Sequence, residues 1–261
     1  MAVYYGEARI DQFVREVFFP LQTKGTFIEI GAAGPEFLSI SLHFRKSGWR
    51  VISVEPNPYF CSLHRERGHE MLQYACGDHD EDDVEFELAY SQTEGDRITF
   101  ESYSALRILE EYKNVDLLAF GGMKTEKIKV KLRKIDTLLA QHYQDIDSID
   151  ILSVDVEGWE LQVLDGISME RYRPKVLIVE NYLGCQEYVS YMKNKGYILA
   201  ARRFPNDVYT RNGVFPKWTM WEARVRNMIY ILSEYKTTLR GLHIASEVER
   251  ARKSRTPVTP K

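Results

Sequence analysis

The chain has 261 residues, 44% hydrophobic and 28% charged, which is the composition of a globular protein with enough length to bury a core. Its net charge of −3 argues against nucleic-acid binding over the whole surface, and three scattered cysteines without a CxxC pair argue against a structural zinc site or a disulfide framework. The sequence shows neither an apolar run long enough to span a bilayer nor a signal-peptide pattern, so we expect a cytoplasmic protein without a membrane span and without a nucleic-acid partner.

Strands and helices alternate at short intervals through the first part of the chain. The spacing of apolar residues predicts, in chain order, a helix at 7–19, a strand at 26–31, a helix at 36–48, a strand at 49–56, a helix at 57–67 and a strand at 69–78. Such alternation is typical of a parallel sheet with helices on both faces.

The middle of the chain is less regular. Residues 91–125 have no clear period, and we interpret them as an excursion from the core that contains a helix near 104–113 and contributes to a substrate lid. Around and after this excursion the pattern predicts strands at 83–90 and 126–132, a helix at 134–143, a strand at 148–158, a helix through Leu164, a strand at 175–181, a helix at 185–196 and a closing hairpin in "YILAARRF" and "NDVYTRNG".

The end of the chain differs in character. Residues 226–261 hold eight Lys or Arg and three Glu, which fits either a solvated helix with a frayed tail or a basic contact for an acidic partner. The segment "MIYIL" (228–232) is too apolar to be exposed in a monomer and indicates a homo-oligomer formed through the C-terminal helix. We divide the chain into a main domain at 1–215 and a C-terminal helical extension with a basic tail at 216–261.

The loop "FIEIGAAGPEF" (27–37) has the composition of a ligand-binding turn. A strand leads into Gly31, and Gly34 follows just before the predicted helix, so the backbone can approach a ligand closely. The loop is neither G-x-G-x-x-G nor a phosphate-binding P-loop. The acid Glu29, inside the strand, suits a ligand with an ammonium group.

Two further acids follow the next two predicted strands. Glu55 is placed to accept hydrogen bonds from both hydroxyls of a ribose, and Asp78 to reach an adenine amino group. Ribose, adenine and a zwitterionic amino acid together describe S-adenosylmethionine (SAM); the alternative is that these acids are only a turn and solvated strand ends. The expected cofactor contacts are Glu29, Gly31, Ala32, Ala33, Gly34, Phe37, Glu55, Pro56, Asn57, Asp78 and Asp155.

The chain resembles the FkbM family of SAM-dependent methyltransferases. The resemblance rests on "GTFIEIGAAGPEF", "GWRVISVEPNPYF", "ACGDHDEDDVEFEL", "KLRKIDTLLAQH" and "IDILSVDVEGWELQVLDGI", and continues to about residue 211. It implies a Rossmann-like class I methyltransferase fold, with a seven-stranded, mostly parallel sheet, an antiparallel last hairpin and helices on both faces. It also implies methyl transfer to a hydroxyl of a sugar, a glycan or a small natural product. The loop "GAAGPE" departs from the family pattern, since many members have Asn and a further Gly there, and residues 226–261 lie outside the resemblance.

Carboxylates gather where the predicted buried strands end. Asp155 ends one strand, and Glu180 and Asn181 end its neighbour, so these three oxygen donors are expected to meet at one edge of the sheet. Two interpretations stay open: the three residues bind Mg²⁺ or a similar cation that activates an acceptor hydroxyl, or Asp155 is a general base and Glu180 and Asn181 are structural. Glu157 joins Asp155 as a candidate catalytic residue, whereas Glu160 is assigned to the positive end of the next helix.

Two alternatives to an active methyltransferase are weighed. One is a methyltransferase-like SAM-binding module that has lost catalysis, against which the intact Glu29, Glu55 and Asp155 argue. The other is a nucleotide-dependent oxidoreductase, against which the missing third glycine and the position of Glu29 argue.

Overall fold

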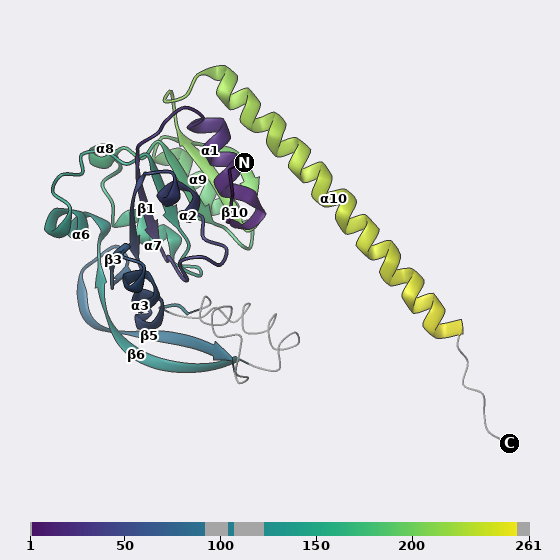
Figure 1. Cartoon of the computed structure of the whole chain (residues 1–261), viewed down its shortest axis with the longest axis horizontal. Helices are drawn as coiled ribbons and strands as arrows, with labels where there is room; N and C mark the ends of the chain where they lie inside the picture. Colours follow the sequence, from purple (N-terminus) through teal and green to yellow (C-terminus); the bar gives the residue numbers. More distant parts are fainter. Residues whose placement is uncertain (1, 92–103, 107–122, 255–261) are drawn as a thin grey trace.

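A seven-stranded sheet forms the centre of the protein (Figure 1). The computed structural model describes residues 2–91, 104–106 and 123–254. The strand order is β3-β2-β1-β7-β8-β10-β9; the first five strands run parallel, and β10 is antiparallel to both β8 and β9. This confirms the predicted mostly parallel sheet and its closing hairpin. The strands are β1 (Thr26–Ile30), β2 (Arg50–Val54), β3 (Glu70–Leu72), β7 (Ile151–Val154), β8 (Val176–Glu180), β9 (Tyr197–Arg203) and β10 (Asn206–Arg211).

Helices cover both faces of this sheet because successive strand side chains point to opposite sides. In β1, Ile28 packs into a core with the helices on one face, and Phe27 packs into a second core on the other. The first core contains side chains from α6 (Ile135–His142), α7 (Glu160–Asp165), α8 (Met169–Tyr172) and α9 (Gln186–Asn194). The second contains side chains from α1 (Ile10–Phe18), α2 (Leu42–Lys46) and α10 (Lys217–Ser254).

A small second sheet corrects the prediction of one strand at 69–78. The chain leaves the main sheet after β3 and enters a three-stranded sheet of order β4-β6-β5, made of β4 (Ala75–Cys76), β5 (Glu81–Ser91) and β6 (Met123–Arg133). Ala75 pairs with Leu132 of β6, whereas Leu72 pairs with Val54 of β2. Pairing partners distant in sequence therefore decide where the predicted strand divides.

The predicted helix at 36–48 is also shorter than expected. Only Leu42–Lys46 is helical, because Leu38 has a left-handed backbone with φ of 52°. The hydroxyl of Ser39 accepts a hydrogen bond from the backbone N–H of Leu42, and that of Ser41 donates to Glu29. Serine side chains thus replace helical bonds over this segment. The helix predicted at 7–19 also begins later than expected. Residues Glu7–Arg9 form a short 3₁₀ turn, η1, and the positive φ angles of Ala8 and Arg9 prevent the α-helix α1 from beginning before Ile10.

Two predictions for the middle of the chain lie mostly outside the described residues. These are the helix at 104–113 and the lid within 91–125; of this stretch, Ala105 pairs with Glu87 of β5.

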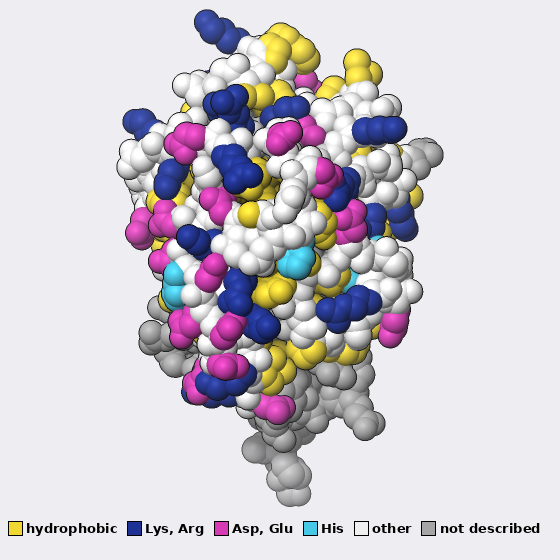
Figure 2. All heavy atoms as spheres, turned by 90° about the vertical axis from the view of Figure 1, so that its left-hand side faces the viewer, with side chains coloured by type: hydrophobic (Ala, Val, Ile, Leu, Met, Phe, Trp, Pro, Cys, Tyr) yellow, Lys and Arg dark blue, Asp and Glu magenta, His cyan; other side chains and the backbone are white. Residues whose placement is uncertain are grey.

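On the face turned away from α10, acidic and basic side chains are interleaved (Figure 2). Among the described helices, none combines the length and the apolarity that crossing a membrane would require.

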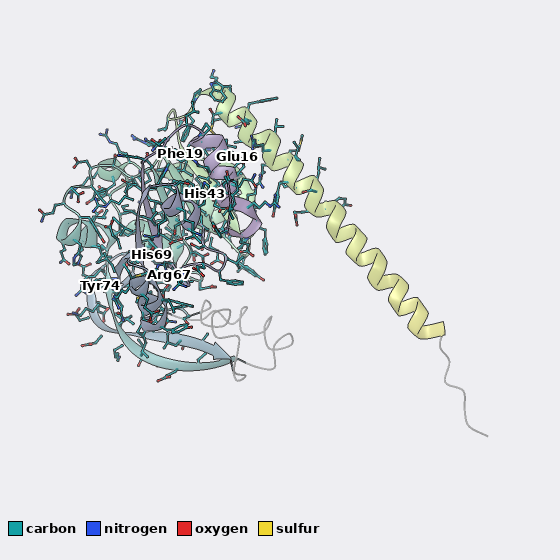
Figure 3. All side chains as sticks on the ribbon, viewed as in Figure 1. Glu16, Phe19, His43, Arg67, His69 and Tyr74 are labelled. Atoms are coloured by element: carbon teal, nitrogen blue, oxygen red, sulfur yellow. The ribbon has the colours of Figure 1, made fainter. Side chains whose placement is uncertain are left out.

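The C-terminal extension is the helix α10, which begins at Lys217 and projects away from the domain (Figure 1). Its first turns are anchored on α1 and β9. Arg226 forms an ion pair with Glu16 at 2.7 Å, and Figure 3 shows Glu16 on α1 beside the helix. The rings of Tyr230 and Phe13 lie 4.3 and 4.5 Å from the guanidinium carbon of Arg203. The division of the chain at residue 215 stays a prediction.

Candidate active site

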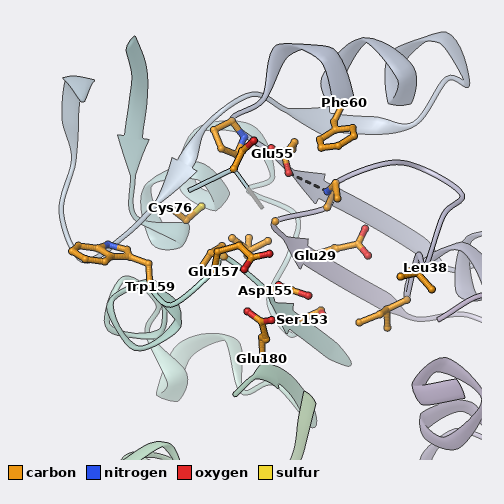
Figure 4. A pocket seen from close by; sticks show the side chains of 18 of the residues that line it. Glu29, Leu38, Glu55, Phe60, Cys76, Ser153, Asp155, Glu157, Trp159 and Glu180 are labelled. Atoms are coloured by element: carbon orange, nitrogen blue, oxygen red, sulfur yellow. Dashed lines mark hydrogen bonds between the residues drawn. The ribbon is translucent and has the colours of Figure 1, made fainter. Parts of the chain in front are cut away.

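One pocket opens at the carboxyl ends of the parallel strands (Figure 4). Each of four neighbouring strands brings a carboxylate to it: Glu29 from β1, Glu55 after β2, Asp155 after β7 and Glu180 at the end of β8. The parallel register aligns these ends, since the backbone N–H of Gly31 bonds to Val54 and that of Asp155 to Ile30. Ligands of open α/β sheets bind at this edge.

The turn after β1 fits tightly against the end of β7. Gly31 has φ of +77°, and a side-chain carbon on it would lie 1.6 Å from the backbone oxygen of Asp155. Only glycine meets both conditions, because L-residues disfavour that φ and any Cβ would overlap a main-chain atom. The sequence analysis assigned Gly31 to close approach of a ligand. The structure shows that packing against the backbone of Asp155 already requires a glycine at this position.

Glu55 and His64 hold Ala33, two residues after Gly31 in this loop, from two sides. Ala33 has a left-handed backbone with φ of 43°, and its N–H donates to the Glu55 carboxylate at 3.0 Å. Its carbonyl lies 3.1 Å from Nε2 of His64, a buried side chain of α3 (Pro58–Glu66). Burial lowers the pKa of His64 to about 4, so the ring is neutral at pH 7 and donates one N–H to the carbonyl. The other Glu55 oxygen accepts from the backbone of Asn57 at 2.8 Å.

Glu29 is a buried carboxylate that faces the pocket. The hydroxyls of Ser41 and Ser53 donate to it at 2.7 and 3.3 Å, and Arg45 donates in turn to Ser53 at 3.0 Å. Burial raises the pKa of Glu29, although these hydrogen bonds and the charge of Arg45 oppose the shift. A ligand cation would remove the cost of this buried negative charge.

Asp155, Glu157 and Glu180 form a carboxylate cluster in the centre of the pocket (Figure 4). One oxygen from each lies within 4.8 Å of the others. Burial, followed by the charge of Glu160, raises the pKa of Asp155 to about 7, and burial and Asp155 raise that of Glu180 well above its usual range. Like charges at this separation require a proton or a cation between them. Oε2 of Glu180 is buried without a hydrogen-bond donor among the described residues.

Glu160 shapes the turn that carries this cluster. Its buried carboxylate accepts from the backbone N–H groups of Val156 and Gly158 at 3.2 and 2.9 Å, and from the hydroxyl of Tyr188 at 2.6 Å. These bonds hold a turn in which Glu157 has a left-handed backbone with φ of 59°. Glu160 does begin α7, as expected for an acid at a helix N-terminus, but its carboxylate is used mainly to support the turn that carries the carboxylate cluster.

Most of the predicted cofactor contacts meet in this pocket. Of these predicted contacts, the ones that line the pocket are Glu29, Gly31, Ala32, Ala33, Gly34, Phe37, Glu55, Pro56 and Asp155. Asn57 is absent from the lining because it caps α3, where its side chain accepts from the N–H of Tyr59. Asp78 is also outside the lining, and its exposed carboxylate pairs with His79 at 2.6 Å.

The proposed metal ligand Asn181 requires a correction. It lies outside the pocket lining, and its amide is used in structural bonds: Nδ2 donates to Asp207 and to the carbonyl of Cys185, and Oδ1 accepts from the N–H of Cys185. Glu157 takes its place beside Asp155 and Glu180. The sequence alone could not show that Asn181 has a structural role, because it does not reveal that the chain turns away from the pocket immediately after β8.

Aromatic side chains that the sequence analysis did not single out also line the pocket. Trp159 follows the carboxylate turn, and Tyr182 and Phe204 have ring centroids 5.3 Å apart. Phe204 is 57% exposed, and Phe37, one of the expected cofactor contacts, is 51% exposed. Phe204 belongs to the turn of the closing hairpin, and only the antiparallel return of β10 beside β8 brings that turn to the pocket.

The seven-stranded sheet, with a pocket at its carboxyl edge, defines a Rossmann-like α/β protein. A family model described as the methyltransferase FkbM domain matches residues 29–199. The chain belongs to this family of methyltransferases, which confirms the resemblance seen in its motifs.

Two individual proteins illustrate how far the likeness extends. Methyltransferase sdnD of Sordaria araneosa is 39% identical over 59 residues, which cover 20% of this chain and 22% of the relative. The chain thus spans about a fifth of that relative's length. The solved structure of precorrin-6y C5,15-methyltransferase from Geobacter metallireducens GS-15 aligns over 77% of this chain and 86% of that one, with 10% identity and a TM-score of 0.37. The family assignment does not rest on this structural likeness.

Proposed function

We propose that the protein is a SAM-dependent O-methyltransferase that acts on a hydroxyl of a sugar, a glycan or a small natural product. The observation that carries this proposal is the convergence of Glu29, Glu55 and Asp155 on one pocket at the carboxyl edge of the sheet. Bound SAM supplies a methyl group on a sulfonium, which is already a good leaving group. The protein has therefore to bind the cofactor, orient the acceptor oxygen and remove its proton.

The residues present fit the cofactor. Glu29 is a buried carboxylate whose hydrogen bonds from Ser41 and Ser53 leave it facing the pocket, which suits an ammonium group. Glu55 lines the pocket, and its two oxygens accept from the backbone N–H groups of Ala33 and Asn57; a carboxylate oxygen can accept more than one hydrogen bond, which suits the hydroxyls of a ribose. The backbone bonds orient this carboxylate before any ligand binds.

The carboxylate cluster supports two mechanisms for deprotonating the acceptor. In the first, Asp155 alone is the general base; its pKa of about 7 suits a group that must gain a proton near neutral pH. In the second, Asp155, Glu157 and Glu180 hold a divalent cation such as Mg²⁺, which would lower the pKa of a hydroxyl bound to it. The donor set fits a hard cation, since all three are carboxylates and one buried oxygen of Glu180 lacks a donor among the described residues.

The rim of the pocket supports an acceptor with apolar or ring-shaped faces. Phe37, Tyr182 and Phe204 present exposed aromatic surface beside the carboxylates. Aromatic rings of this kind pack against the apolar faces of sugars and of cyclic natural products. A cytoplasmic location stays a prediction of the sequence.

The deciding experiment is calorimetric titration of the full chain with SAM, followed by detection of S-adenosylhomocysteine with a panel of sugar and natural-product alcohols. We expect binding in the micromolar range and turnover with at least one alcohol. Binding without turnover on any acceptor would favour the inactive SAM-binding module. Binding of a nicotinamide dinucleotide in place of SAM would favour the oxidoreductase.

A further inference from the structure

The helix α10 has two faces with different roles. Toward the domain, Ala223 is fully buried, the side-chain oxygen of Asn227 accepts from the backbone of Arg202 at 3.1 Å, and Tyr230 packs on Arg203. These contacts fix how the helix is rotated about its axis. The opposite face therefore points away from the protein's own domain.

That outward face carries a regular apolar repeat. Its residues are spaced alternately by three and four, which is a period of 3.5 residues. We call this row the seam: Trp218, Trp221, Val225, Met228, Leu232 and Tyr235, with the same spacing continued in the sequence by Leu239 and Leu242.

The described part of the seam is open to solvent in the single chain. Trp221 is 68% exposed, Tyr235 is 61% exposed and Leu232 is 52% exposed. A soluble monomer rarely leaves a continuous apolar row of this length uncovered. Ala223 and Tyr230, which pack on the domain, occupy the position opposite the seam in the seven-residue repeat, so the domain cannot cover it.

We propose that the seam binds the same seam of a second copy of this chain, as an antiparallel two-stranded coiled coil. A 3.5-residue repeat keeps one stripe of a helix in contact with another helix that carries the same repeat. Among the described helices the next longest, α1, α3 and α9, have nine residues each, too few to match a seam of more than three heptads. A second α10 has the required length and pattern.

The flanking residues favour the antiparallel orientation. Ile229 and Ile231 lie on either side of the seam at its middle, and an antiparallel pairing centred there places each against its own counterpart in the second copy. A parallel pairing would instead set Ile229 against the charged Arg224. Residues 243–261, which follow the seam, hold five Lys or Arg and two Glu, and an antiparallel pair keeps these two basic segments at opposite ends.

Sedimentation velocity of the full chain at micromolar concentration tests the interface. We expect a dimer, and Leu232→Lys should raise its dissociation constant by at least about tenfold, because a charge would enter the apolar seam. Ser233→Lys adds the same charge one residue away, outside the seam, and should leave the dimer intact. Circular dichroism checks that both variants fold. A monomeric wild-type chain, including one that instead co-sediments with anionic vesicles, contradicts the proposal, and so does a dimer that survives Leu232→Lys.

Cross-linking tests the orientation. In a Cys185→Ser background, chains carrying Met228→Cys are mixed with chains carrying Leu232→Cys and oxidised mildly. Because the antiparallel pairing sets residue 228 opposite residue 232, the mixture should form covalent dimers and either variant alone should not. Efficient cross-linking of each variant by itself would overturn the antiparallel assignment. The proposal does not depend on SAM or on the methyl acceptor, so it can fail independently of the proposed function.

Discussion

Gly31 packs directly against the backbone of Asp155: a side-chain carbon on Gly31 would lie 1.6 Å from the Asp155 carbonyl oxygen. The turn proposed to bind the cofactor and the turn that carries the candidate base are thus in main-chain contact. A change in one turn must displace the other, because neither has a flexible side chain at the point of contact.

The first prediction follows from this contact. Gly31→Ala should lower the free energy of unfolding by about 3 kcal/mol or more, because it combines a disfavoured φ with overlap against a backbone atom. Gly48→Ala is the matched control, since Gly48 has φ of +84° but open space around it, and should cost only about 1 kcal/mol. Urea denaturation of both variants measures the difference. Equal losses would mean that the Gly31–Asp155 contact relaxes without cost.

The second prediction concerns SAM affinity. Glu55→Ala should weaken binding by about 2–3 kcal/mol, because it removes the charge-assisted hydrogen bonds to the ribose and frees the Ala33 backbone that Glu55 holds. Asp78→Ala serves as the control. The sequence suggested an adenine contact for Asp78, but its carboxylate is exposed and paired with His79, so we expect SAM affinity to change less than about twofold. Calorimetry that finds the opposite order would restore Asp78 to the cofactor site and remove Glu55.

The third prediction separates the two mechanisms. If the carboxylate cluster binds a cation, EDTA should abolish turnover, Mg²⁺ should restore it, and SAM affinity should change little. Glu157→Gln should then raise the Mg²⁺ concentration needed for half-maximal turnover by about tenfold, whereas Asn181→Asp, outside the cluster, should not improve it. An enzyme shown by elemental analysis to be metal-free and still fully active would leave Asp155 as a general base. Asp155→Asn cannot discriminate, since both mechanisms predict an inactive protein.

The fourth prediction concerns pH and stability. The pKa of Asp155 is about 7 in the folded protein and near 3.8 without the effect of burial, so the folded state retains a proton that the unfolded chain has already released. This group therefore contributes most to stability below about pH 4, and the contribution is lost as the pH rises through 7.

Urea titrations of the wild type and of Asp155→Asn at pH 5 and pH 8 measure this term together with that of Glu180, whose pKa is raised by burial and by the charge of Asp155. The wild type should lose more stability across this window than the variant does, by about 1 kcal/mol or more. Burial lowers the pKa values of His64 and His69 to about 4, which favours the folded state as the pH rises, but this contribution is common to both proteins and cancels in the comparison. A parallel pH dependence in the two proteins would contradict a raised pKa at Asp155.

Local patterns in the sequence predict much of the fold. Buried parallel strands need apolar side chains on both faces, and such short apolar runs, alternating with helical periodicity, placed β1, β2 and β8 within two residues of their observed bounds. The strand predicted at 148–158 is shorter in the structure, because β7 ends at Val154 and Glu157 already has the left-handed backbone of a turn. The carboxylates Glu29, Glu55 and Asp155 could be assigned to one edge for the same reason, because parallel strands share the direction in which they end.

Tertiary structure alone decided the features that depend on partners distant in the chain. The segment 69–78 divides between two sheets because Leu72 pairs with Val54 and Ala75 with Leu132. Asn181 does not join the carboxylate cluster, because its amide donates a hydrogen bond to Asp207, a residue of the strand β10 that returns beside β8. Local sequence encodes which segments are buried and where they end, but hydrogen bonds and packing between distant segments determine which polar side chains remain free for chemistry.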